Sequence, residues 1–494
     1  MLRLATALLT LSTFAMPAAA EQVLTYHNSP ARTGAYKVPG LTVAAAATVT
    51  PDTSFSATLS GHIYAQPLYW QPKGGAAEVI VATENNIVYA LNATTGAIVW
   101  HTQLASPATS GLPCGNINPE GIDGAPVIDP ATGTLYVNAL TQSGSNFRHM
   151  VYALSLSSGA VVSGWPIDIQ AQLATRGITF SSANQGERSG MLFTGGALYV
   201  VYGGKYGDCL PYHGTVTQID PVSASLTAAW QTRASGGGIW AQGGIAAEGK
   251  SLFITTGNTF NANGTYGDGE SIIRLKAGLA PPSSTTDYYA PANWQTLDND
   301  DSDLGGTEAL PVRVADGTGK TAARSLALGK DGNAYLVNRN NLGGVGGPAT
   351  IVKVSNSVIL TGPAVYSTSA TDLVAFTNFS AVGCPGGVSG NTIMALKLSP
   401  SKTSPVTIPW CTAYNGNGSP IITTTDGTAN PIVWVVGAEG DNKLHGYNAL
   451  TGASLFTGST AMSGLHHFQT LIVAGGHFYV AADNTVYAFG FTPG

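Results

Sequence analysis

A short pattern recurs along the whole chain and limits the folds that it can form. Its clearest copies are Val88–Gly96 (VYALNATTG), Val151–Gly159 (VYALSLSSG) and His445–Gly452 (HGYNALTG). Weaker copies, which bring the number to eight, lie at Thr215–Asp220, Ile272–Leu275, Ala334–Asn338, Ile393–Leu396 and Val486–Phe489. A unit that returns at this spacing indicates a fold built from similar modules, so chain length does not set the number of domains.

Each copy belongs to a group of short strands. A β-branched and aromatic run such as Val79–Ala82 precedes it, and another strand, often ending in Trp as at Ile98–Trp100, follows it. These groups form antiparallel meanders of about 40 residues, which is the period of a propeller blade. We therefore predict an all-β fold, an eight-bladed β-propeller of four-stranded antiparallel blades. The predicted blades are 60–105, 123–166, 190–232, 237–277, 307–345, 362–400, 418–456 and 464–492.

The N-terminal residues divide into a predicted signal peptide and a segment that is predicted to close the ring. Arg3, the apolar run Leu4–Phe14 and the small residues at 18–20 predict a signal peptide over residues 1–20. The mature chain is then periplasmic or secreted. We expect residues 21–494 to form a single propeller domain, with the N-terminal segment 21–58 supplying a strand that closes the ring. No later apolar stretch is long enough to predict a membrane span.

Composition excludes several classes of function. Only 10% of residues are charged, against about 25% in an average soluble domain. Hydrophobic residues make up 44% and the net charge is −6, which excludes a disordered chain. No basic patch is present, so nucleic acid is not an expected partner.

The four cysteines permit disulfides in an oxidising compartment. They are Cys114, Cys209, Cys384 and Cys411. Three pairings are possible, and we favour Cys384 with Cys411 as the local one. No CxxCH motif is present, so covalently bound haem is not expected.

The repeat resembles that of the quinoprotein alcohol dehydrogenases. These are eight-bladed propellers that bind pyrroloquinoline quinone (PQQ), usually with Ca²⁺, at the ring axis. Non-catalytic scaffolds such as the outer-membrane assembly propeller share the repeat. The opening YHNSPARTG, Tyr26–Gly34, is similar to the start of poorly characterised, exported bacterial members of this family.

Four segments carry the resemblance further. In the first, Gly236-Gly-Gly-Ile-Trp240 is followed 18 residues later by Asn258. The resemblance implies that Trp240 forms a floor under the quinone, that Gly237 and Gly238 let it approach the backbone, and that Asn258 binds the metal. The alternative is a Trp in ordinary blade packing and an Asn in a turn.

The second segment is the acidic run Asp298–Gly305. The resemblance implies a catalytic base here, which takes the hydroxyl proton of the substrate. Asp301 and Asp303 are the candidates, with Asp300 also possible. Carboxylates this dense also fit a Ca²⁺ site or a solvated loop.

The third segment contains a candidate cation for the quinone, Lys330, and the fourth contains a candidate acid for the metal, Asp208. Lys330 lies where the family places a Lys or Arg on the quinone oxygens, although Lys330-Asp-Gly332 also fits a hairpin turn. The family's metal-binding Glu aligns with Cys209 or its neighbour Asp208, which becomes the candidate acid ligand. The adjacent cysteine pair of many family members is missing, and Cys114 is a candidate to pair with Cys209 across the mouth instead. Asp123 and the pair His466-His467 are further candidates to face the axis.

Two functions follow. The resemblance implies an exported, PQQ-dependent oxidoreductase with Ca²⁺, which oxidises an alcohol or sugar hydroxyl and passes electrons to a separate acceptor. The alternative is a non-catalytic propeller that binds a protein or a glycan in the cell envelope. Convergence of Trp240, Asn258, Lys330 and an acid of the 300–303 run in space favours the first.

Overall fold

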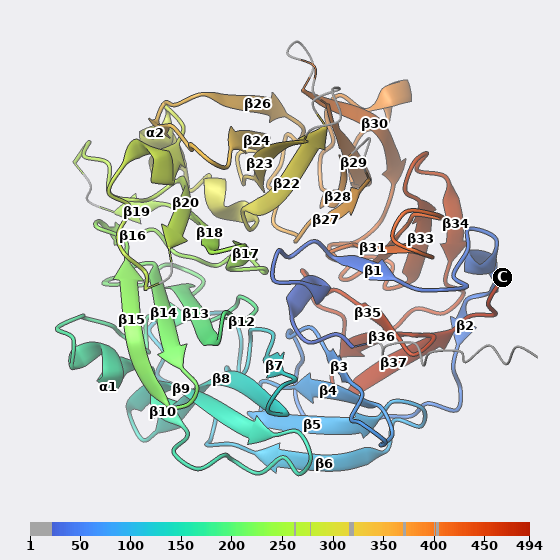
Figure 1. Cartoon of the computed structure of the whole chain (residues 1–494), viewed down its shortest axis with the longest axis horizontal. Coiled ribbons are helices and arrows are strands. Elements are labelled where there is room, and N and C mark those ends of the chain that lie inside the picture. The colour runs from blue at the N-terminus through green and yellow to red at the C-terminus, as the bar shows by residue number, and fades with distance from the viewer. Residues whose placement is uncertain are drawn as a thin grey trace, which may run out of the picture.

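A computed structural model describes residues 22–260, 263–276, 278–315, 321–368, 372–399, 401 and 405–494. The predicted signal peptide lies outside these residues. Eight small antiparallel sheets stand around a central axis, which confirms the predicted eight-bladed β-propeller (Figure 1).

The first four blades follow one another along the chain. Blade 1 is β3 (Leu68–Trp70), β4 (Glu78–Ala82), β5 (Ile87–Asn92) and β6 (Ile98–Gln103). Blade 2 is β7 (Val127–Asp129), β8 (Thr134–Ser143), β9 (Asn146–Ser155) and β10 (Ile167–Asp168). Blade 3 is β12 (Leu192–Thr194), β13 (Ala197–Gly204), β14 (Thr215–Asp220) and β15 (Ser225–Gln231), with β11 (Gln185–Gly186) added to β13. Blade 4 is β17 (Ala246–Glu248), β18 (Ser251–Thr256), β20 (Ser271–Lys276) and β21 (Tyr288–Ala290), extended by β25 (Gly344–Val345).

The other four blades complete the ring. Blade 5 is β22 (Leu310–Ala315), β23 (Thr321–Leu328), β24 (Asn333–Asn338) and β26 (Ala349–Lys353). Blade 6 is β27 (Ala364–Ser367), β28 (Asp372–Asn378), β29 (Thr392–Leu398) and β30 (Val406–Ala413). Blade 7 is β31 (Ile421–Thr424), β32 (Ile432–Val436), β33 (Leu444–Asn448) and β34 (Ser454–Thr457). Blade 8 is β35 (Ile472–Ala474), β36 (His477–Ala482) and β37 (Thr485–Gly490), completed by β2 (Thr50–Pro51) from the N-terminal segment.

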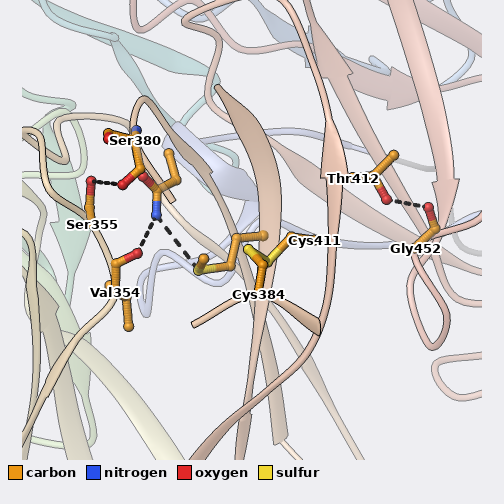
Figure 2. The surroundings of a disulfide bond; sticks show 9 residues. Val354, Ser355, Ser380, Cys384, Cys411, Thr412 and Gly452 are labelled. Carbon is orange, nitrogen blue, oxygen red and sulfur yellow. Dashed lines mark hydrogen bonds between the residues drawn. A yellow bond between two sulfur atoms is a disulfide. The ribbon is translucent and has the colours of Figure 1, made fainter. Parts of the chain in front are cut away.

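The Trp and the Thr-Gly turn of the repeat join consecutive blades. The indole nitrogen of Trp100, on blade 1, donates to the carbonyl of Leu156 on blade 2 at 2.9 Å. Gly159 lies under the same ring, where an added Cβ would approach the indole to 2.5 Å. Trp410 repeats this contact with blade 7, and Thr412 beside it donates to the carbonyl of Gly452 at 2.6 Å (Figure 2). The turn therefore needs Gly because the preceding blade's Trp packs directly on it.

The N-terminal segment also enters the centre of the ring (Figure 1). β1 (Ala35–Lys37) runs parallel to β31 at the inner edge of blade 7. Before it, the segment 24–34 bonds through its backbone to blades 2, 4, 6 and 7: Leu24 with Ile128, Pro30 with Ala247, Thr33 with Val365 and Gly34 with Ile422. The segment thus fills the axis and joins blades that are distant in the chain.

Blade 6 carries a disulfide between Cys384 and Cys411, which confirms the favoured pairing (Figure 2). Cys411 lies on β30, and Cys384 immediately precedes a short 3₁₀ turn, η5 (Pro385–Gly387). Cys114 and Cys209 are free thiols, so the suggested bond between them is not formed. They do meet, because the Cys209 amide donates to the Cys114 sulfur at 3.3 Å.

Helices are short and lie in two of the long connections between blades. They are α1 (Ile169–Ala174) and α2 (Trp294–Asp300). Among the helices of the described residues, none combines the length and the apolar character needed to cross a lipid bilayer.

Candidate functional site

Loops from blades 4 and 5 bring most of the predicted site residues together. Trp240 lies between β16 (Ser235–Gly236) and β17, and Asn258 between β18 and β19 (Thr259–Phe260). Asp301 and Asp303 follow α2, and Lys330 lies in the turn between β23 and β24. Residues up to 90 positions apart therefore meet, and they come from four different connections.

Asp303 is the centre of this group. One carboxylate oxygen accepts the backbone amide of Asn258 at 2.9 Å. The other accepts the indole nitrogen of Trp240 at 3.0 Å and the ammonium of Lys330 at 2.9 Å. Only 4% of the Asp303 side chain is exposed, and Gly257 leaves it room, since a Cβ there would lie 2.8 Å from its carboxyl carbon. Its oxygens are thus occupied by protein donors.

Lys330 joins the two predicted acids. Its ammonium lies 2.6 Å from Asp301 and 2.9 Å from Asp303, and 5.5 Å from the centre of the Trp240 ring. Burial works to lower the pKa of Lys330, but the carboxylates of Asp303 and Asp301 outweigh it, and the pKa rises. Lys330 therefore stays charged. Asp301 differs from Asp303 because 64% of its side chain is exposed.

Asp208 stands beside this group without bonding to it. Its carboxylate accepts the hydroxyl of Tyr212 at 2.7 Å. Burial raises the pKa of Asp208, and the negative charges of Asp303 and Asp301 raise it further. The three acids are therefore close enough to interact electrostatically. The predicted metal ligand Asn258 meets the group through its backbone amide. Asp300 is exposed at the end of α2.

The two predicted cofactor-binding glycines lie in buried backbone behind Trp240. Gly237 has a positive φ of 64°, and a Cβ on it would meet Thr232 at 2.6 Å. Gly238 packs on the backbone of Gly203 and Gly204, with a Cβ approach of 3.2 Å to the Gly204 amide. These contacts account for glycine at both positions, and their predicted contact with a cofactor stays a prediction.

Sequence reasoning missed a buried acid beside Asp303. Glu270 is fully buried, and one of its oxygens accepts the amide of Leu304 at 2.6 Å. Its other oxygen has no hydrogen-bond partner among the described residues. Burial, followed by the charge of Asp303, raises the pKa of Glu270 well above its ordinary range. The sequence signal for Glu270 is the run Gly267–Glu270, which directly precedes β20. This run does not reveal that the acid is buried.

A small cleft lies beside Trp240. Its walls include two ion pairs: Lys205 contacts Glu120, and Arg188 lies 3.8 Å from Asp123. A second small cleft shares Asp123 and Arg188 with the first. It continues toward the start of blade 1 and blade 8, where Tyr64, His467 and Phe468 line it. Asp123 and His467 therefore line the same cleft, and the prediction that they and His466 face the axis stays a prediction.

Comparison with solved structures finds propellers of the same design. The quinohemoprotein alcohol dehydrogenase from Comamonas testosteroni superimposes with a TM-score of 0.66 at 15% identity, over 95% of this chain and 80% of that one. A europium-containing methanol dehydrogenase gives 0.64 at 12% identity, over 95% and 98%. BamB from Moraxella catarrhalis gives 0.50 at 16% identity, over 90% and 98%. No protein-family model and no curated protein matches the sequence. The shared feature at these identities is the quinoprotein-like propeller fold.

Proposed function

We propose that the protein is an exported, PQQ-dependent oxidoreductase that oxidises an alcohol or sugar hydroxyl. The observation that carries this proposal is the convergence of Trp240, Asn258, Lys330 and two acids from separate loops, with Trp240 lining a cleft.

The residues present fit the proposed cofactor. Trp240 offers a flat aromatic surface on the cleft wall, Arg188 lines the same cleft, and the Lys330 ammonium lies 5.5 Å from the centre of the Trp240 ring, which suits a planar ligand that carries carboxylates and quinone oxygens. A hard cation prefers oxygen ligands, and the oxygens of Asn258, Asp208 and Glu270, one of which has no hydrogen-bond partner among the described residues, are the candidates to supply them. When bound, the quinone supplies the acceptor for two electrons from the substrate carbon.

The geometry separates the roles of the two candidate acids. Asp303 positions the site, because its three accepted hydrogen bonds hold Trp240, Asn258 and Lys330 in place. Asp301 has one charged partner and an exposed carboxylate, so it has a free lone pair to take a substrate proton. Lys330 bonds to both acids and so holds Asp301 at a fixed place relative to Asp303 and Trp240.

Reconstitution tests the proposal directly. Mature protein is incubated with PQQ and Ca²⁺, desalted, and scanned for retained quinone absorbance, followed by turnover of alcohols and sugars with a soluble dye as the acceptor. We expect retained quinone for the wild type. The substitution D301N should keep the quinone and lose at least about a hundredfold in turnover, whereas D303N should lose the quinone. D300N is the matched control, since Asp300 is exposed on the adjoining helix end.

The outcomes separate the roles. If D303N keeps the quinone and D301N turns over normally, Asp303 is the base and the assignment above is wrong. If no variant and no wild-type sample retains quinone, the oxidoreductase proposal is wrong. Electrons are proposed to leave to a separate acceptor, because the chain has no CxxCH haem motif.

One observation favours the second candidate, a non-catalytic binding propeller. The cations that line the first cleft already have acidic partners, Lys205 with Glu120 and Arg188 with Asp123. A cleft with paired charges also suits a polar glycan, which is recognised by hydrogen bonds to such groups. Glycan-array binding that is lost in R188A, in protein that retains no quinone, would favour this candidate.

A further inference from the structure

Two histidines and an aspartate meet where the first and last blades of the ring join. His62 precedes blade 1, His466 precedes blade 8, and Asp483 lies in the turn between β36 and β37. His62 Nδ1 lies 2.8 Å from one Asp483 oxygen, and His466 Nε2 lies 2.7 Å from the other. The three donor atoms all lie within 4.8 Å of one another, and His62 is 421 residues from Asp483 in the chain.

The arrangement differs from the other His–carboxylate contacts of the described residues. His477 with Asp52, His445 with Asp441 and His467 with Glu439 each join one imidazole to one acid. Here two imidazoles converge on a single carboxylate. Two imidazoles and one carboxylate, with a further position open, form a common ligand set for Zn²⁺.

Distances suit a small ion between the three groups. Bonds of about 2.0–2.2 Å place the donors of a tetrahedral zinc site roughly 3.4 Å apart. The present separations of 2.7 and 2.8 Å therefore need to widen by roughly 0.6 Å, which side-chain rotation provides. The side chain of His62 is 45% exposed, against 20% for His466 and 18% for Asp483, so an ion can enter from the His62 side.

Surrounding contacts hold the carboxylate and one imidazole in place. The Asp483 amide donates to the carbonyl of Gly464 at 2.9 Å, and the Ile63 amide donates to the Asp483 carboxylate at 3.3 Å. The ring of Tyr64 stacks on His466 with a centre-to-centre distance of 4.4 Å. Such supporting contacts are what orient the ligands of metal sites, and here they come from both blades.

We propose that His62, His466 and Asp483 bind a divalent transition metal ion, Zn²⁺ among the common ones, which joins the start of blade 1 to blade 8. The site is separate from the proposed Ca²⁺ position beside Asp303, since its nitrogen donors favour zinc and copper over calcium. Its effect is mechanical: the metal ties together loops from opposite ends of the chain at the rim of the second cleft, which Tyr64 lines.

Calorimetric titration of Zn²⁺ into chelator-treated mature protein tests the proposal. We expect one site per chain, a raised melting temperature with Zn²⁺, and no displacement by excess Ca²⁺. D483N and H62A should each weaken binding at least about tenfold and remove the thermal shift. H477A is the matched control, because it removes a last-blade histidine that pairs with a single acid.

Two further measurements make the result decisive. Co²⁺ substitution should give the visible absorption of a low-coordinate nitrogen and oxygen site in the wild type and not in H62A. H62A also covers the case in which D483N does not fold, because His62 is the most exposed of the three. Absence of stoichiometric Zn²⁺ binding, or binding that H62A leaves unchanged, overturns the proposal and leaves a hydrogen-bonded His–Asp–His cluster only.

Discussion

Replacement of Arg32 tests whether the N-terminal segment holds the ring together. Arg32 is fully buried at the axis, and its guanidinium makes five hydrogen bonds of 2.6–3.2 Å. The acceptors are the carbonyls of Tyr26, Gly190, Met191 and Ile245 and the hydroxyl of Thr25. The charge of Glu308 acts on Arg32 to raise its pKa, although burial outweighs this and lowers the pKa to about 10, so the side chain is charged at neutral pH.

The cost of Arg32→Met follows from these contacts. The change leaves the five buried acceptors without this donor, and an unpaired buried acceptor costs about 1–3 kcal/mol, so we expect a loss of about 3–5 kcal/mol. The loss involves three separate segments, at residues 25–26, 190–191 and 245. Arg32→Lys keeps the charge but loses the planar fork, so we expect about 1–3 kcal/mol.

Urea unfolding followed by tryptophan fluorescence measures both variants. The midpoint should fall for Arg32→Met with little change in slope, since the surface exposed on unfolding is nearly the same. Arg313→Met is the control: Arg313 pairs with Glu248 at 3.0 Å on the surface, and such pairs contribute about 0–1 kcal/mol. A loss for Arg32→Met no larger than that of the control would refute the view that this segment holds the ring.

Two other predictions concern buried ionisable groups. Burial raises the pKa of Glu308 from an ordinary 4.5 to about 7. Because the folded protein binds this proton more tightly than the unfolded chain, the group stabilises the fold fully below pH 4.5. This contribution, about 3 kcal/mol in total, is lost as the pH rises through 7. Glu308→Gln removes this loss, and urea unfolding at pH 5 and pH 8 should show the variant gaining on the wild type at the higher pH; an equal difference at both pH values would contradict it. Burial, with the contact to Cys209, raises the pKa of Cys114 to about 12, so iodoacetamide at pH 8 should label Cys114 more than about a hundredfold slower in the folded than in the unfolded chain, as read by peptide mass spectrometry. Labelling at equal rates would show that the thiol is not held in this environment.

The blades were predictable because each is a local unit. Strand, turn and strand of one blade lie within about 40 residues, and their alternation and turn residues are visible in sequence. The pairing of Cys384 with Cys411 is local for the same reason, since 27 residues separate the two and both belong to blade 6. The Trp100 and Gly159 contact between blades also leaves a trace, because it imposes the same residue types in blade 7.

Residues that are far apart in the sequence and meet in space leave no such trace. Arg32 reaches Ile245 across 213 positions, and His62 reaches Asp483 across 421, so no local pattern links them. The candidate site beside Trp240 was partly predictable because a family motif marks its residues. Which of Asp301 and Asp303 is buried could not be inferred, since the two are separated by one residue and differ only in how the turn after α2 directs them.

Four glutamates are buried in the interior of this propeller. Only 10% of the residues are charged, yet Glu84, Glu187, Glu270 and Glu308 are all buried, each with one oxygen that no described residue hydrogen-bonds. Burial raises the pKa of every one of them. Apolar residues of similar volume would fill the same space without this cost, so stability does not account for the acids. Buried acids with raised pKa values are typical of sites that handle protons or cations, which is the chemistry that the group around Asp303 is proposed to perform.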